Sequence, residues 1–154
     1  MEPGRAPLWW RLYAMVWLLF AEFAVLLAFG SGAVPYWTHV ALGVGVLALA
    51  WGNARALANS EAPARLKRVS AVTARLAGAQ VVMGAALALD LNVSLGLSPL
   101  GIIGVLHLTA AFAMITQASS VATAYDMWEE REYESATTGV AAASQEAAQG
   151  ISAA

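Results

Sequence analysis

Long apolar segments alternate with short polar ones along most of the 154-residue chain. Four of these segments are each about 20 residues long, the length at which a helix crosses the hydrocarbon core of a bilayer, and they cover residues 8–29, 36–54, 70–91 and 100–123. Pro7, Pro35 and Pro99 stand at or just before the starts of three segments, where a helix tolerates a missing N–H. The pattern predicts an all-α, integral membrane, up-and-down four-helix bundle.

Composition narrows the classes of function. Only 12% of the residues are charged and 60% are hydrophobic, which leaves too few charges for an ordinary soluble surface. Cysteine is absent, which excludes disulfides, thiolate ligands and cysteine nucleophiles. The sequence also contains no Gly-rich phosphate loop, no metal-cluster spacing and no basic patch typical of nucleic-acid binding. Membrane lipid is therefore the expected surrounding, and no nucleic-acid partner is expected.

Basic residues are distributed unevenly about the predicted spans. Arg5 and Arg11 flank the first span, and the connection between the second and third spans is surrounded by Arg55, Arg65, Lys67, Arg68 and Arg75. The other two connections contain no Lys or Arg. Because connections rich in Lys and Arg stay on the inner side, we expect a multi-pass protein of the cell membrane with both termini cytoplasmic.

The segment 133–154 differs in composition from the spans. Most of it is small, polar and of low complexity, and it lacks the bulky apolar side chains that offset the entropy of ordering. We therefore expect a disordered cytoplasmic tail over 133–154 and a four-helix membrane domain over 1–132.

The chain has only two histidines, and both fall inside predicted spans. His39 lies about one turn from the outer end of the second span, and His107 lies about two turns from the outer end of the fourth. These spans run in the same direction and are diagonal neighbours in an up-and-down bundle. Two imidazoles at similar depth across that diagonal predict axial ligation of a haem iron in the outer half of the membrane.

Small residues stand close to both histidines. Gly43 follows His39 by one turn and Ala111 follows His107 by one turn, which leaves room for a flat ring. Other interpretations stay open, since small residues are also common at transmembrane helix contacts. Likewise His39 can sit among headgroups, and His107 can form an interhelical hydrogen bond.

Glu22 is the third ionisable residue of interest, and it lies deep in the first span. Ionisable side chains inside a bilayer are costly, so each is a functional hypothesis. One interpretation is a protonated carboxyl bonded to a neighbouring helix. The other is a functional group, either a proton relay or a carboxylate that adjusts the haem potential.

The segment AQVVMGAALALDLNVSLGLSPLGIIGVLHLTAAFAMI resembles one half of a haem A synthase. That family repeats a four-helix unit with a histidine on the second and fourth helices, matched here by His39 and His107. Its third helix often carries Gln followed by Gly, and its fourth carries His-Leu with a nearby Ala. The matching residues here are Gln80, Gly84, Leu108, Ala110 and Ala111.

The resemblance implies a bis-histidine haem b whose pocket includes Gln80, and a homodimer of a compact, half-length member. It also implies oxidation of a ring methyl of haem O, the substrate, to the formyl group of haem A, the product. Glu22 is the candidate catalytic carboxylate, because Tyr36 and Val40 stand where the family usually has Glu and Arg.

Two alternative functions do not need that chemistry. One is a b-type cytochrome that transfers electrons between quinol and an outside acceptor, which suits an iron with both axial positions filled. The other is a haem-free accessory or assembly subunit of a respiratory complex. The expected partners are accordingly a quinone or components of a terminal oxidase.

Overall fold

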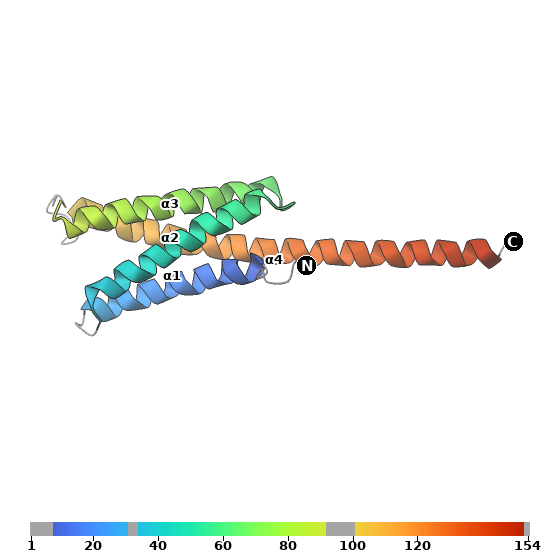
Figure 1. The fold of residues 1–154 in the computed structure, drawn as a ribbon, viewed down its shortest axis with the longest axis horizontal. Helices are drawn as coiled ribbons and strands as arrows, with labels where there is room; N and C mark the ends of the chain where they lie inside the picture. The colour runs from blue at the N-terminus through green and yellow to red at the C-terminus, as the bar shows by residue number, and fades with distance from the viewer. Residues whose placement is uncertain (1–7, 31–33, 92–100, 153–154) are drawn as a thin grey trace.

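In the computed structural model the described residues are 8–30, 34–91 and 101–152, and they form four α-helices. The helices are α1 (Leu8–Gly30), α2 (Tyr36–Ala58), α3 (Ala64–Ala88) and α4 (Gly101–Ser152) (Figure 1). Arg5, Pro7, Pro99 and most of the two connections without Lys or Arg lie outside the described residues.

The helices form an up-and-down bundle, as the sequence predicts. Each helix packs against the ones before and after it, and α1 also packs against α4, so α2 and α4 lie across a diagonal (Figure 1). All four helices are long and apolar enough to cross a membrane. The placement of both termini in the cytoplasm stays a prediction.

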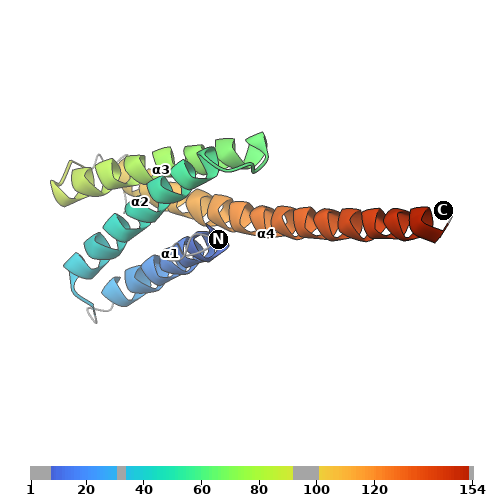
Figure 2. The same ribbon diagram turned by 45° about the vertical axis from the view of Figure 1, so that its right-hand side comes forward.

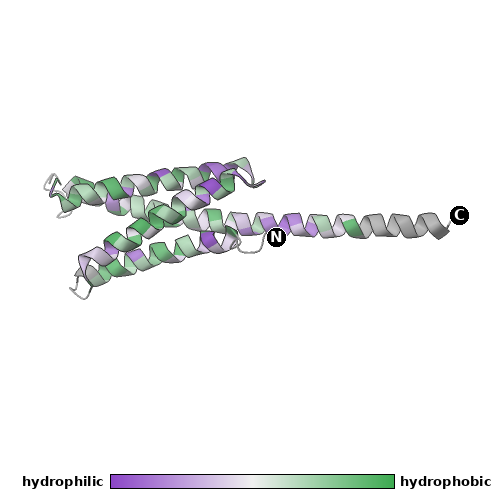
Figure 3. Ribbon diagram, in the orientation of Figure 1, coloured by the Kyte–Doolittle hydropathy of each residue, from purple (hydrophilic) through white to green (hydrophobic). Residues whose placement is uncertain are grey.

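Charged residues gather at one end of this bundle. The α2–α3 connection at residues 59–63, the start of α1 and the point where α4 leaves the bundle share that end (Figure 1). Figure 3 shows hydrophilic residues concentrated there. We call this the closed end, and we call the other end, where α1 and α3 stop and α2 and α4 begin, the open end.

Two helices extend beyond the predicted spans at the closed end. α2 continues to Ala58, and α3 begins at Ala64, directly after Pro63. The backbone N–H groups of Leu66 and Lys67 donate to the Pro63 carbonyl. Hydropathy underestimates the length of both helices, because the backbone hydrogen bonds of a helix can continue past the apolar residues into water.

The fourth helix also differs from expectation. α4 continues to Ser152, through the segment for which the sequence predicts disorder. Its side chains from 131 to 140 are exposed, so no tertiary packing supports this part of the helix. The segment 136–152 is rich in alanine, with glutamine and glutamate among the other residues, and these residue types have high helix propensity. Local backbone hydrogen bonds therefore account for the helix.

Packing is uneven along the bundle axis. The buried apolar residues of the four helices fall between Leu12 and Leu19, Val46 and Leu57, Leu66 and Ala77, and Met114 and Tyr125. All of these ranges lie toward the closed end. Toward the open end the α1–α2 pair diverges from the α3–α4 pair (Figures 1 and 2). The closed half therefore holds the core, and the open half holds the site described next.

Candidate functional site

A cavity of about 540 Å³ occupies the open half of the bundle, with lining residues from all four helices. Pockets that hold cofactors and small molecules usually enclose about 300–1,000 Å³. Six of the residues that the sequence singles out line this cavity: Glu22, His39, Gly43, Gln80, His107 and Ala111. The remaining lining is mainly apolar, and Tyr36 and Val40 belong to it.

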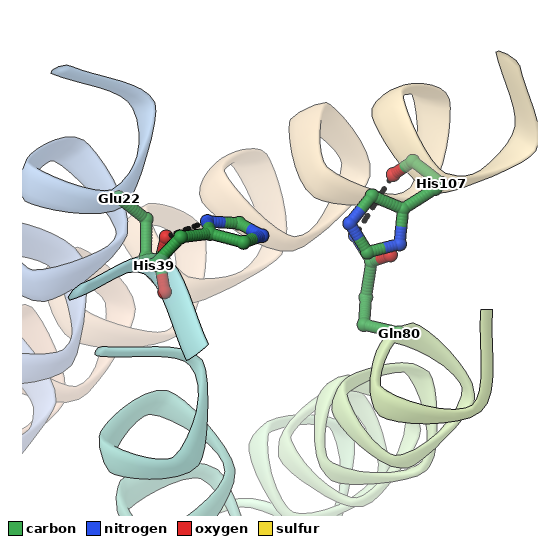
Figure 4. Close-up of polar contacts among 4 residues, drawn as sticks. All are labelled: Glu22, His39, Gln80 and His107. Carbon is green, nitrogen blue, oxygen red and sulfur yellow. Dashed lines mark hydrogen bonds and ion pairs between the residues drawn. The ribbon is translucent and has the colours of Figure 1, made fainter. Parts of the chain in front are cut away.

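His39 and His107 face each other across the cavity from the diagonal helices α2 and α4 (Figure 4). Their ring centroids are 6.3 Å apart and their planes are inclined at 73°. The two histidines therefore lie at the same depth, as their positions in parallel helices predict. Each imidazole points a nitrogen toward the other ring (Figure 4).

The separation of the two rings fits a metal between them. Two metal–nitrogen bonds of about 2 Å each, together with the radii of two five-membered rings, give about 6 Å between centroids. Each ring can rotate about its own metal–nitrogen bond, so the angle of 73° is compatible with ligation. Nowhere in the described parts of the chain do three or more His, Asp or Glu side chains converge as metal ligands. The two imidazoles of His39 and His107 therefore offer two nitrogen donors across the cavity.

Glu22 pairs with His39. Oε2 of Glu22 lies 2.5 Å from Nδ1 of His39 (Figure 4). The Glu22 side chain is only 12% exposed, against 34% for His39. Its other oxygen, Oε1, is buried and has no hydrogen-bond partner among the described residues. The expected contact with a neighbouring helix is therefore present, and the group contacted is an imidazole of the site.

Two glycines make room for this arrangement. A Cβ atom at Gly43 would lie 3.3 Å from Oε1 of Glu22, and one at Gly84 would lie 3.6 Å from Cε1 of His107. The sequence predicts that Gly43 leaves space for a ring. In the structure Gly43 lets α1 bring the Glu22 carboxylate close to α2, and Gly84 leaves space beside an imidazole.

His107 is held differently from His39. Nε2 of Gln80 donates to the backbone carbonyl of His107 at 2.9 Å, not to its ring (Figure 4). Within the described ranges, Nδ1 of His107 and Oε1 of Gln80 are buried without a hydrogen-bond partner. Gln80 therefore fixes the backbone near His107 and leaves its imidazole without a hydrogen-bonded support.

A second polar group lies in the closed half and was not singled out from the sequence. Asn53 is 1% exposed, and its Nδ2 donates to the carbonyl of Arg11 at 3.2 Å. The hydroxyl of Thr73 on α3 lies 2.9 Å from Oε1 of Gln117 on α4 and 2.9 Å from the Val69 carbonyl of its own helix, so its one proton is shared between two acceptors. Such contacts link transmembrane helices, and we interpret them as structural.

Three features fit a flat, metal-containing prosthetic group. They are the two imidazoles that face each other, the space beside Gly84, and the buried polar atoms that have no hydrogen-bond partner among the described residues. In comparisons with protein-family models, curated proteins and solved structures, nothing matches this chain. The resemblance to haem A synthases therefore rests on the residues that carry it, and the fold is that of a four-helix membrane protein.

Proposed function

We propose that this chain is a membrane protein that holds one haem b between His39 and His107 and transfers electrons as a b-type cytochrome. The observation that carries the proposal is the 6.3 Å separation of the two rings, one from each diagonal helix. A haem iron supplies one-electron redox chemistry, and two imidazole ligands leave it no open position, which suits electron transfer.

The roles of the chain's own residues follow from their positions in the cavity. His39 and His107 provide the nitrogen donors, and Glu22 orients His39 through Nδ1. Gly84 and Ala111 leave space for the ring system, and the mainly apolar lining excludes water. A quinone or a component of a terminal oxidase is the proposed redox partner, and the half-length chain is the proposed protomer of a homodimer.

A second candidate is oxidation of haem O to haem A. The residues that carry the family resemblance support it, because Gln80 and Gly84 both lie against His107. Glu22 is then the catalytic carboxylate, although its Oε2 contacts His39. Tyr36 and Val40 line the cavity where the family usually has Glu and Arg, so electron transfer ranks first.

Titration of haemin into the purified full-length protein tests haem binding. We expect one haem per chain and the absorption spectrum of a six-coordinate, low-spin iron. His39→Ala and His107→Ala should abolish that spectrum. Thr109→Val is the matched control, because its exposed hydroxyl contacts only the Val105 carbonyl of its own helix. A wild-type protein that binds no haemin would support a haem-free accessory subunit instead.

The two redox functions are separated by their products. Cells that supply haem O are used to express the protein, and the bound pigments are extracted and chromatographed. Electron transfer predicts unchanged haem b, whereas haem A or a hydroxylated precursor would support the synthase.

A further inference from the structure

We propose that the two histidines are unequal ligands: Glu22 anchors His39 as the permanent ligand, and His107 is the exchangeable one. Small external ligands such as carbon monoxide then reach the metal from the α3–α4 side of the cavity. This inference rests on the proposed haem-binding function, and it adds a positioning residue and an entry side to that function.

The first step concerns the tautomer of His39. When the ring proton is on Nδ1, this N–H donates to the Glu22 carboxylate, and the lone pair is on Nε2. Nε2 is the nitrogen that points toward His107 (Figure 4). A carboxylate that accepts from the second nitrogen of a ligating histidine fixes the ring and strengthens it as a donor. Glu22 therefore prepares His39 for ligation before any metal is bound.

The second step concerns the freedom of His107. Its Nδ1 has no hydrogen-bond partner among the described residues, so rotating this ring breaks no hydrogen bond. A Cβ at Gly84 would lie 3.6 Å from Cε1, so the glycine leaves about the volume of a methyl group unfilled beside the ring. Oε1 of Gln80 is also buried and unpartnered in that part of the cavity. The α3–α4 side thus offers room and a polar atom to an incoming ligand.

A double-mutant cycle on haemin affinity tests the role of Glu22. We expect His107→Ala to bind haemin at least about ten-fold more tightly than His39→Ala. Adding Glu22→Leu should weaken binding by about 10- to 100-fold in the His107→Ala background, the usual cost of losing such a support. In the His39→Ala background it should change affinity by less than about two-fold, since the group it supports is already gone.

The controls separate positioning from folding. Glu22→Gln keeps the shape and an acceptor oxygen, so it should lose less affinity than Glu22→Leu. Helix content and gel-filtration volume should match the wild type for every variant used. An equal loss from Glu22→Leu in both backgrounds, or no loss in either, would overturn the anchoring role.

Carbon monoxide identifies the ligand that leaves. In the reduced wild-type protein it should displace His107, so the C–O stretching frequency should equal that of His107→Ala and differ from that of His39→Ala. A wild-type frequency that matches His39→Ala would overturn the inference, and so would a wild-type protein that binds no carbon monoxide.

Failure of the proposed function looks different, because wild type would then bind no haemin. The contact between Glu22 and His39 is still measurable in the haem-free protein by ¹⁵N NMR, because the chain has only two histidines to contribute imidazole signals. At alkaline pH His39 should show the proton on Nδ1, and Glu22→Gln should alter its signals but not those of His107. A proton on Nε2 of His39 would contradict the anchoring role.

Discussion

His39 and His107 face each other across the diagonal of the bundle with ring centroids 6.3 Å apart, and only His39 has a carboxylate, that of Glu22, against its second nitrogen. The two imidazoles thus share a cavity but not a support. This inequality is the basis of our proposal that His39 is the anchored ligand and His107 the exchangeable one.

Filling the cavity beside His107 should weaken haem binding without unfolding the bundle. Gly84→Leu places a branched side chain beside the imidazole, and overpacking of this kind costs about 1–3 kcal/mol, or roughly 5- to 150-fold in affinity. Gly78→Leu is the matched control on the same helix, because a Cβ there meets nothing within 4 Å. Haemin titration measures the difference, and equal affinities would mean that the ring system does not use this space.

Crowding the Glu22 carboxylate should reproduce part of the loss of haemin affinity that we expect for Glu22→Leu. In Gly43→Ala the new Cβ lies 3.3 Å from Oε1 of Glu22, so the carboxylate must shift. We expect a cost of about 1 kcal/mol, or roughly five-fold in haemin affinity. Gly45→Ala is equally tight, but its neighbour at 3.2 Å is Cδ2 of Leu18, so haemin affinity should stay unchanged.

The contact between Thr73 and Gln117 should contribute measurably to the stability of the closed half. A cycle of Thr73→Val, Gln117→Leu and the double variant should give a coupling of about 0.6 kcal/mol, and no more than about 1.7 kcal/mol, the range for such contacts in membranes. Unfolding in detergent measures it. Thr116→Val is the control, because its exposed hydroxyl contacts only the Phe112 carbonyl of its own helix.

The extended part of α4 should be dispensable for the site. The side chains of residues 136–140 are exposed, so a stop codon after Ser135 should leave haemin affinity and thermal midpoint within error of the full chain. A stop after Ala124 also removes Tyr125, which is buried, and should cost about 1.5–3 kcal/mol of stability. A large loss of haemin affinity or thermal stability after the stop at Ser135 would show that the extended part of α4 has a partner.

Single cysteines can determine the orientation in the membrane, since the natural chain has none. Glu61 and Leu91 are exposed at opposite ends of the bundle. If the positive-inside prediction is right, Leu91→Cys reacts with an impermeant maleimide on intact cells. Glu61→Cys should then react only after permeabilisation. The reverse labelling pattern would place the termini outside.

The sequence alone determined the four helices and the depth of the histidines. Apolar length sets the spans, and the direction of alternate spans brings His39 and His107 to one level of the bundle. The candidate residues also lie near the same ends of their helices, and in the structure they line one cavity. The helices α2, α3 and α4 extend beyond the predicted spans, since a helix can continue beyond apolar residues.

Only the tertiary structure decided which groups meet inside the bundle. The Glu22–His39 pair depends on the rotation of α1 about its own axis. In a soluble helix the hydrophobic pattern indicates that rotation, but lipid and bundle interior are both apolar, so a transmembrane sequence carries a much weaker signal. For the same reason the sequence predicted space for a ring at Gly43, which lines the cavity, but gave no sign that the packed helices bring the Glu22 carboxylate beside this glycine.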